Sequence, residues 1–362
     1  MIPMRVNNLH AVSLLLLVIL FWIIVICGFF YQTSMTEKSD SRIVIAKKLI
    51  RRHPGLTIRE HINNRSDKKE ASDQLDFEKQ FERNLAGLDL YRYRWTILER
   101  DFCSTRYRNL FLLIIVHTAV SHVKERQAIR EMWGNIRLYD KYKSAVVFAL
   151  GETTNETLRR IIKQESTRYR DIIQQNFLDA YKLLVLKGLM WIRFVAEYCP
   201  KVPFIMKLDD DVAVNYIAVL RFLTIRVRRK LLPNKRLIMC RLMDGSPAIR
   251  DKNNKWYISS AEYPNDVFSA YCSGLAFIIT SDLIRPMMKE AQKSKLIWVD
   301  DFFLTGYLTA NASVTFEDIG SLYEMNAAKV ETSMSGGLKL FGVVRSVNQH
   351  KRVWKKMSSH YQ

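Results

Sequence analysis

Short apolar runs alternate with amphipathic stretches between residues 109 and 350. The apolar runs predict buried strands at residues 110–116, 145–150, 204–208, 237–242 and 275–279. Stretches of helical length lie at residues 124–133, 156–165, 179–197 and 216–229, and the third has apolar residues at spacings of three and four. Because strands and helices alternate, the pattern predicts an α/β domain with a largely parallel sheet over residues 109–350.

A different pattern occupies the N-terminus. Residues 11–30 carry no charged side chain, and residues 14–26 are all apolar. About 20 such residues span a bilayer as a helix. A cleaved signal peptide is the alternative, but the stretch is longer than a typical apolar signal region, and no small-x-small cleavage pattern follows Tyr31. We therefore expect an uncleaved transmembrane signal anchor over residues 11–31, preceded by a tail of residues 1–10.

The residues around this segment do not agree on its orientation. Only Arg5 precedes it, whereas several basic residues follow it: Lys38, Arg42, Lys47, Lys48, Arg51 and Arg52. By the positive-inside rule, this asymmetry places the C-terminal part of the chain in the cytosol. Glycosylation sequons at Asn64, Asn155 and Asn311 would instead suit a lumenal location. These residues leave the topology open.

Residues 32–108 form a predicted stem. Up to about residue 102 the segment is polar and charged, and residues 63–70 have the composition of a solvated linker. Aromatic side chains between residues 76 and 95 are suited to pack against the domain that follows. Beyond the domain, residues 351–362 are expected to form a short C-terminal tail.

Composition narrows the class of protein only partly. The 362 residues are 48% hydrophobic, which is enough for one sizeable core. The formal charge of +20 favours anionic partners, such as nucleic acid, an acidic membrane surface or phosphate-bearing small molecules. Nucleic acid ranks last, because the sequence contains no zinc-finger spacing and no RNA-binding signature.

The cysteines carry information about the compartment. Cys27 lies inside the predicted span, and four others follow it: Cys103, Cys199, Cys240 and Cys272. An even number suits two disulfides in an oxidising lumen, with three possible pairings. Four buried thiols are the alternative.

An acidic run, Asp209-Asp210-Asp211, follows the predicted strand at residues 204–208. In open α/β sheets, ligands bind outside the carboxyl ends of strands. Strand alternation would direct Asp209 and Asp211 to one side and Asp210 to the other. Two hard oxygen ligands at this spacing suit Mn²⁺ or Mg²⁺, which can also bind a diphosphate. A solvated acidic turn is the alternative interpretation.

Two further clusters are candidates for chemistry. Arg126 and Arg130 lie four residues apart on one predicted helix face, where they could hold phosphate or order the strand-to-helix loop. Ordinary surface arginines are the alternative. Asp300 and Asp301 lie beside aromatic residues, and a partly apolar setting raises the pKa of a carboxylate towards that of a general base. Aspartate as a helix cap is the alternative there.

Several motifs follow one another along the chain. They are Arg126-x-x-Ile129-Arg130 with Trp133, Phe148-x-Leu150-Gly151, a block from Glu165 to Lys187, Lys207-x-Asp209-Asp210-Asp211-Val212-x-Val214-Asn215, Tyr271-Cys272-Ser273-Gly274, and Asp300-Asp301-Phe302 with Gly306. In this order they resemble the β-1,3-galactosyltransferase family (glycosyltransferase family 31), which also includes β-1,3-N-acetylglucosaminyltransferases. The resemblance covers residues 110–350. The chain departs from the family pattern at Met132, Arg170, Asn176, Leu183 and Asp300.

The resemblance implies a GT-A type nucleotide-sugar-binding fold. It also implies a single-pass type II protein of the Golgi membrane, with residues 1–10 in the cytosol and the catalytic domain in the lumen. The implied reaction is an inverting transfer of a hexose or N-acetylhexosamine, with galactose favoured, from a UDP-sugar to a hydroxyl of a glycoprotein or glycolipid glycan in β-1,3 linkage. Mn²⁺ is the implied cofactor, and no nucleic acid is expected as a partner.

The same resemblance assigns roles to individual residues. Asp211 and Asp209 would bind the metal, and His350 would complete its shell. The nucleotide-sugar would be bound by Arg126, Arg130, Lys207, Asp209 and Asp210. Asp301 would be the general base that removes the proton of the acceptor hydroxyl.

Two other functions are alternatives to glycosyl transfer. A catalytically degenerate Golgi scaffold or binding protein would account for the departures from the family pattern, although Asp209, Asp211 and Asp301 are retained. A metal-dependent phosphotransferase would explain neither the anchor nor the ordered motifs. The sequence leaves the donor sugar and the acceptor glycan undetermined.

Overall fold

A computed structural model describes residues 89–358, apart from residues 136, 138–140 and 233–235. These residues all belong to one compact unit, Phe77–Gln362. The predicted anchor, the tail before it and most of the predicted stem lie outside the described residues. Within the described part of the chain, the helices are too short or too polar to cross a membrane.

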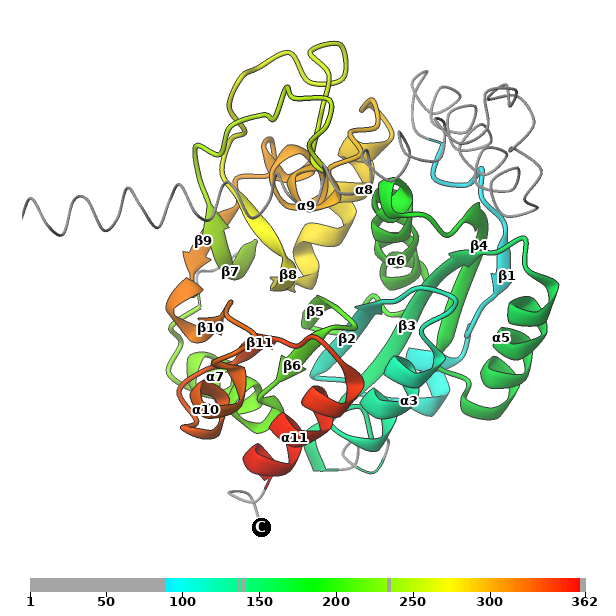
Figure 1. Ribbon diagram of the computed structural model, residues 1–362, viewed down its shortest axis with the longest axis vertical. Coiled ribbons are helices and arrows are strands. Elements are labelled where there is room, and N and C mark those ends of the chain that lie inside the picture. The colour runs from blue at the N-terminus through cyan, green and yellow to red at the C-terminus, as the bar shows by residue number, and fades with distance from the viewer. Residues whose placement is uncertain (1–88, 136, 138–140, 233–235, 359–362) are drawn as a thin grey trace, which may run out of the picture. The chain divides into compact units, whose positions relative to one another are not determined.

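The main sheet has eight strands in the order β1-β4-β3-β2-β5-β8-β7-β9 (Figure 1). In that order they are β1 (Trp95–Ile97), β4 (Ile172–Leu178), β3 (Ser144–Glu152), β2 (Leu112–His117), β5 (Phe204–Asp209), β8 (Tyr271–Thr280), β7 (Leu237–Met243) and β9 (Thr315–Asp318). The four from β4 to β5 are parallel, whereas β8 is antiparallel to both of its neighbours. The expected mixed, largely parallel α/β fold is therefore confirmed.

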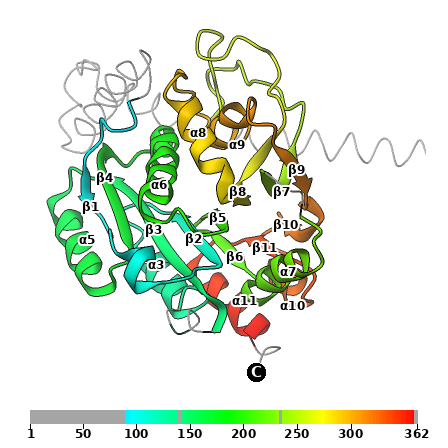
Figure 2. The ribbon, with the colours of Figure 1, turned by 180° about the vertical axis from the view of Figure 1, so that it is seen from behind.

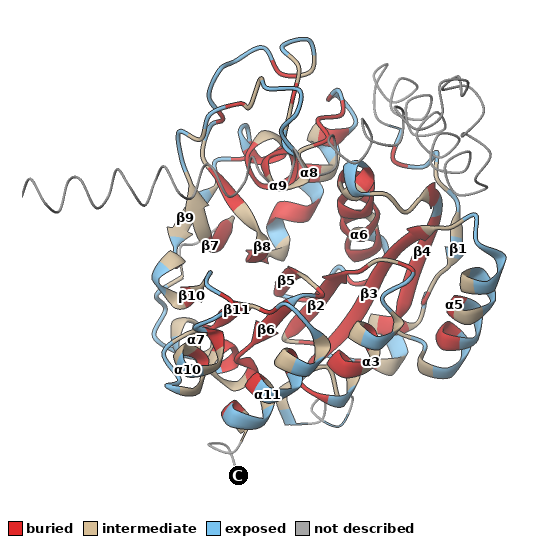
Figure 3. Ribbon diagram, in the orientation of Figure 1, coloured by how far each residue is buried: buried red, intermediate tan, exposed pale blue. Residues whose placement is uncertain are grey.

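Helices cover both faces of this sheet. They are α3 (Val123–Glu131), α5 (Glu156–Tyr169), α6 (Leu184–Tyr198), α7 (Tyr216–Arg228), α8 (Ile284–Ala291) and α9 (Asp300–Thr305). Two further helices, α10 (Val330–Ser335) and α11 (Val347–Ser358), pack on each other and on a second, smaller sheet. One apolar core lies between the sheet and α6, α8 and α9, and a second lies between the sheet and α3, α5 and α7. The buried strands between these layers are seen in Figure 3. Two cores explain why the central strands are apolar throughout.

Helix α6 packs closely on α9 because it carries a glycine at the contact. A Cβ added to Gly188 would lie 2.4 Å from Cδ1 of Leu304. Real Cβ atoms do not approach other carbons so closely, so α9 can take this position only beside a glycine. The contact matters for the site, since α9 begins with Asp300 and Asp301.

A second, three-stranded sheet adjoins the acidic run. Its order is β10 (Tyr323–Glu324), β11 (Phe341–Val343) and β6 (Val212–Val214). Strand β6 begins one residue after Asp211, so the chain leaves the main sheet at Asp209 and enters the second sheet at Val212. The backbone N–H of Val344 donates to the Asp211 carbonyl at 2.9 Å. The acidic run therefore forms the junction of the two sheets.

The folded unit extends beyond both predicted limits of the domain. Strand β1, inside the predicted stem, pairs antiparallel with β4 at the outer edge of the sheet (Figure 2). At the other end, α11 continues past residue 350 and buries Val353 and Met357. Residues 95–97 belong to the domain because their backbone forms hydrogen bonds with the edge of the sheet. Amino-acid composition does not reveal such backbone pairing.

Two disulfides join distant parts of the chain. Cys103 pairs with Cys199, and Cys240 pairs with Cys272. The first ties the segment after β1 to the end of α6, and the second joins β7 to β8. This pairing is one of the three left open by the sequence, and the alternative of four free thiols was wrong.

Candidate active site

Lys207 stands between the two acidic motifs. This buried side chain donates from Nζ to Oδ1 of Asp209 at 2.8 Å and to the Gly274 carbonyl at 2.8 Å. Burial by itself would lower the pKa of the Lys207 ammonium. The charges of Asp209, Asp300 and Asp301 outweigh burial and raise that pKa. Lys207 therefore stays cationic and holds the end of β5 against β8.

Asp210 points to the loop between β2 and α3. Its Oδ2 accepts a hydrogen bond from the Thr118 hydroxyl at 2.6 Å and contacts Nδ1 of His122 at 2.8 Å. The hydrogen bond to Asp210 raises the pKa of His122, and it outweighs the opposing effect of burial. These contacts hold Asp210 against the loop after β2. Asp210 and Asp211 line one cleft, so the expected strand alternation does not continue past the end of β5 at Asp209.

Asp211 is an exposed residue at the edge of a cleft of about 500 Å³. Desolvation by the surrounding protein, followed by repulsion from Asp209 and Asp210, raises the pKa of Asp211 to about 6. We give more weight to the repulsion, because the exposed carboxylate keeps much of its hydration. A bound cation would relieve the repulsion between these carboxylates. Besides Asp210 and Asp211, the cleft is lined by His122, His350 and the segment from Val343 to Val347.

His350 reaches this cleft from α11, beside Asp210 and Asp211. The side chain is buried, and burial lowers the pKa of the imidazole to about 4, so the ring is neutral. Its Nε2 accepts a hydrogen bond from Nε1 of Trp133 at 3.2 Å. A metal ligand needs a free lone pair, so His350 could bind a cation through Nε2 only after giving up this hydrogen bond.

The available side chains suit a metal ion that is also bound by a substrate phosphate better than one bound by the protein alone. Within the described part of the chain, no three His, Cys, Asp or Glu side chains are grouped closely enough to hold a metal ion. Mg²⁺-like cations, however, are commonly bound by one or two carboxylates together with substrate phosphates. Asp211 and Asp209, whose side chain is 39% exposed, supply such carboxylates.

Asp300 and Asp301 occupy the first turn of α9, and Val299 is the N-cap residue, so neither aspartate caps the helix. Burial raises the pKa of Asp300 to about 7, with a partly compensating effect of Lys207. Burial also raises the pKa of Asp301. A carboxylate in such a setting is a stronger base than one in water.

Strand β8 positions the Asp301 side chain. A Cβ added to Gly274 would lie 3.2 Å from Cβ of Asp301 and 3.5 Å from its Oδ2. The backbone N–H of Phe302 donates to Asp301 Oδ1 at 2.8 Å. A Cβ at position 274 would push the Asp301 side chain away by a few tenths of an ångström, so the glycine lets the carboxylate lie close to the strand that Lys207 also contacts.

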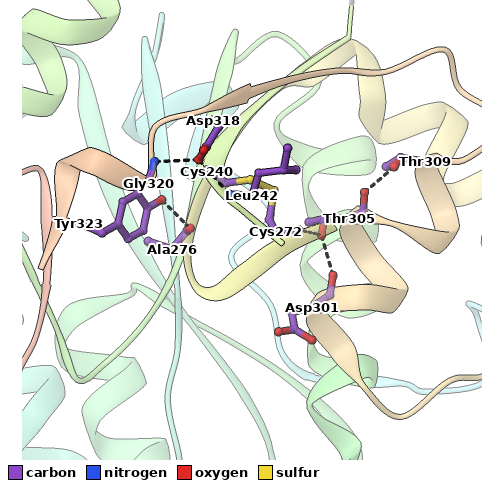
Figure 4. Close-up of a disulfide and its surroundings, with 10 residues drawn as sticks. All are labelled: Cys240, Leu242, Cys272, Ala276, Asp301, Thr305, Thr309, Asp318, Gly320 and Tyr323. Atoms are coloured by element: carbon purple, nitrogen blue, oxygen red, sulfur yellow. Dashed lines mark hydrogen bonds between the residues drawn. A yellow bond between two sulfur atoms is a disulfide. The ribbon is translucent and has the colours of Figure 1, made fainter. Parts of the chain in front are cut away.

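The disulfide between Cys240 and Cys272 fixes β8 beside the first turn of α9, which carries Asp301 (Figure 4). The backbone N–H of Cys272 donates to Oγ1 of Thr305 at 2.9 Å, and that hydroxyl donates to the Asp301 carbonyl at 2.6 Å. A covalent link between β7 and β8 is thereby connected through Thr305 to the first turn of α9.

Arg126 orders the loop after β2, whereas Arg130 contacts other parts of the chain. Arg126 is fully buried, forms two hydrogen bonds with Glu165 at 2.8 and 2.9 Å, and donates to the Ala119 carbonyl at 2.6 Å. Arg130 forms two hydrogen bonds with Asp171 at 2.7 and 2.8 Å and a third with Glu165. The contacts of Arg126 favour the loop-ordering alternative over phosphate binding, and those of Arg130 tie α3 to Glu165 and Asp171.

The sequence interpretation missed Thr118 and His122. Both follow the carboxyl end of β2, which is parallel to β5 with His117 opposite Asp209. The sequence did contain a signal for these two residues, because residues that follow adjacent parallel strands lie at the same edge of the sheet. The order of the strands, which the sequence does not state, was needed to use it.

Comparisons with known proteins agree with the motif order. The chain matches the sequence model of a family described as Galactosyltransferase over residues 124–319. Beta-1,3-galactosyltransferase 1 of Mus musculus is 31% identical over 250 residues, which are 69% of this chain and 74% of that protein. Beta-1,3-galactosyltransferase 2 of Homo sapiens is 32% identical over 216 residues, which are 59% of this chain and 50% of that protein.

Among solved structures, the chain is similar to a glycosyltransferase involved in the glycosylation of the major capsid of PBCV-1. The TM-score is 0.33 and the sequence identity 9%, over 68% of this chain and 99% of that chain. This similarity is too weak to support a conclusion about the present chain.

Proposed function

Because this chain belongs to the galactosyltransferase family and is a glycosyltransferase, we propose that it moves galactose, or another hexose or N-acetylhexosamine, from a UDP-sugar to a glycan hydroxyl in β-1,3 linkage. The observation that carries this proposal is the placement of two acidic motifs on either side of buried Lys207. One motif lies at the junction of two sheets with Asp211 exposed, and the other has raised pKa values at the start of α9. The proposed architecture is of the GT-A type.

The donor is proposed to bind with its diphosphate beside Asp211 and Asp209. Mn²⁺ held there would stabilise the charge that develops on the departing UDP. Lys207 fixes the orientation of Asp209 through the 2.8 Å contact with Oδ1. Asp210 supports the loop that carries His122. In this assignment Arg126, Arg130 and His350 stabilise the site without binding the donor.

The acceptor is proposed to bind on the side of Asp301. The hydroxyl oxygen attacks the anomeric carbon, its proton passes to the Asp301 carboxylate, and the bond from the anomeric carbon to UDP breaks. One displacement inverts the anomeric configuration, so no covalent nucleophile is required. Because burial raises the pKa of Asp301, the carboxylate is a better proton acceptor than in water.

The location of the protein is also part of the proposal. Residues 11–31 are proposed to anchor the chain as a type II protein in the Golgi membrane, with the described domain in the lumen. Two disulfides support an oxidising compartment. The sequon residues Asn155 and Asn311 are both exposed. Mass spectrometry of the chain before and after glycosidase treatment tests whether these residues carry glycans.

The proposed reaction is tested by replacing Asp301 with Asn. Purified protein is assayed with Mn²⁺ and a panel of UDP-sugars, and the UDP released on addition of glycan acceptors is measured. We expect Asp301→Asn to lower transfer by about 10²–10⁴-fold while UDP binding is kept, because only the base is lost. Asp266→Asn, at a side chain that is 96% exposed, is the matched control.

Two results would overturn parts of the proposal. Full transfer activity in Asp301→Asn would remove this residue as the base. UDP binding by the wild-type protein without turnover of any donor would favour the degenerate scaffold.

A further inference from the structure

Three exposed side chains, Tyr181, Lys255 and Trp256, lie next to the buried Trp298, just before the start of α9. Tyr181 is 47% exposed and Trp256 is 55% exposed, although both are large apolar rings. The ammonium group of Lys255 lies 4.3 Å from the ring centre of Tyr181 and 5.7 Å from that of Trp256. Tyr181 also contacts Trp298, with ring centres 6.2 Å apart. We call these four residues the aromatic platform.

The segment that carries Trp256 is held in a defined conformation. Arg250 donates to the carbonyls of Ile258 and Tyr263 at 3.0 and 2.9 Å, and also to that of Asn265. The backbone N–H of Ile258 returns a bond to the Ile249 carbonyl at 2.9 Å, and the Ile258 side chain is buried. Trp256 is therefore presented to solvent by a preformed segment, so that little ordering is needed when a ligand binds.

The aromatic platform borders the proposed base. Trp298 is three residues before Asp301, and its Nε1 donates to the Tyr257 carbonyl at 3.0 Å. This bond connects the segment of Trp256 to the residues that lead into α9. Tyr181, in the short helical turn Tyr181–Leu183 before α6, contacts Trp298 and also Lys255. The aromatic platform thus spans chain segments that meet next to the acceptor side of the site.

We propose that the aromatic platform binds a pyranose ring of the acceptor glycan. This inference rests on the proposed function and adds the place and mode of acceptor binding. A pyranose has an apolar face of C–H groups and an edge of hydroxyls. The exposed rings of Trp256 and Tyr181 match the first, and the Lys255 ammonium donates to the second. Aromatic surface with a few placed polar groups is typical of ligand sites.

Binding can be tested without turnover. The full-length protein is mixed with methyl β-galactoside or methyl β-N-acetylglucosaminide, without donor, and saturation-transfer NMR is recorded. We expect saturation concentrated on the C–H groups of one sugar face. The signal should be lost in Trp256→Ala and largely restored in Trp256→Phe. Tyr91→Ala, which removes another aromatic ring that is 55% exposed, is the control and should leave the signal unchanged.

A kinetic measurement separates this inference from the proposed function. In Trp256→Ala we expect the acceptor KM to rise about tenfold, as for loss of an aromatic anchor. The donor KM should stay unchanged. The slow hydrolysis of the donor, which releases UDP when no acceptor is present, should also stay unchanged. Because Trp256 is exposed, its truncation should not affect the melting temperature.

Other outcomes would contradict the inference. An unchanged NMR signal and acceptor KM in Trp256→Ala would overturn it. Displacement of the sugar signal by UDP would assign the aromatic platform to the nucleotide instead. If no donor were turned over, the proposed function would fail, while sugar binding to the aromatic platform could still be measured by NMR.

Discussion

The two acidic motifs contain the same side chain in different surroundings. Asp210 and Asp211 lie where charged and polar groups of the loop after β2, of α3 and of α11 converge, and Asp211 is exposed. Asp300 and Asp301 lie on an apolar layer, next to a strand fixed by a disulfide. An exposed, mutually repelling group is suited to bind a cation, whereas partly buried carboxylates are suited to accept a proton. The difference shows how environment divides roles among identical residues.

The largest expected effect tests the cation-binding half of this comparison. Replacing Asp211 with Asn removes a hard, charged oxygen ligand, so transfer should fall by at least about 100-fold. Mn²⁺ binding in the presence of UDP, followed by electron paramagnetic resonance, should weaken in parallel. Asp266→Asn again serves as the control. Normal Mn²⁺ binding by Asp211→Asn would show that the acidic run is not the metal site.

A smaller effect concerns the ionic network that supports the first motif. In Arg126→Ala the carboxylate of Glu165 keeps only its bond from Arg130, and the carbonyls of Ala119 and Val120 lose their donor. This loss should lower the free energy of unfolding by about 3–5 kcal/mol. Urea denaturation measures this change. Arg159→Ala breaks an exposed pair with Glu156 and should cost about 1 kcal/mol or less. Equal effects of the two substitutions would contradict the structural role of Arg126.

The smallest effect tests the rigid placement of the second motif. In Gly274→Ala the added Cβ lies 3.2 Å from Cβ of Asp301, so the carboxylate must shift by a few tenths of an ångström. Transfer should fall by about tenfold, because catalysis depends steeply on geometry, while UDP binding stays unchanged. Gly336→Ala is the control, since the added Cβ meets only the Ser333 carbonyl at 3.8 Å. Unchanged kcat in Gly274→Ala would show that the close contact with β8 does not position Asp301.

Strands were predictable where the apolar run is long, and they were missed where it is short or contains polar residues. Strand β6 is apolar and buried but only three residues long. The five apolar runs all form strands, because residues buried on both faces leave a continuous signal. Strand β4 was missed because it contains Gln174 and Gln175, which are buried. Gln174 is satisfied by the Gly151 carbonyl and the Thr96 hydroxyl, and these partners are distant in sequence.

One departure from the family pattern also has a structural explanation. Arg170 stands where the family pattern has Gly, and it adopts the left-handed conformation, with φ of 54°, as the C-cap of α5. Glycine accepts this conformation without steric cost, which explains the usual residue. Arg170 offsets part of that cost with a hydrogen bond to Asp101 at 3.0 Å.

The sequence by itself determined the long apolar strands, the longer helices up to residue 229 and the motifs, because hydrophobic periodicity and strand-end position are local properties. It thus predicted the α/β fold, the acidic run after β5 and the aspartate pair near α9. Only the tertiary structure decided which groups face one another: Lys207 between the motifs, His122 on Asp210, Trp133 on His350 and the carboxylates on both arginines. Such pairings join residues far apart in the chain, and their energies depend on burial and distance that only the folded chain defines.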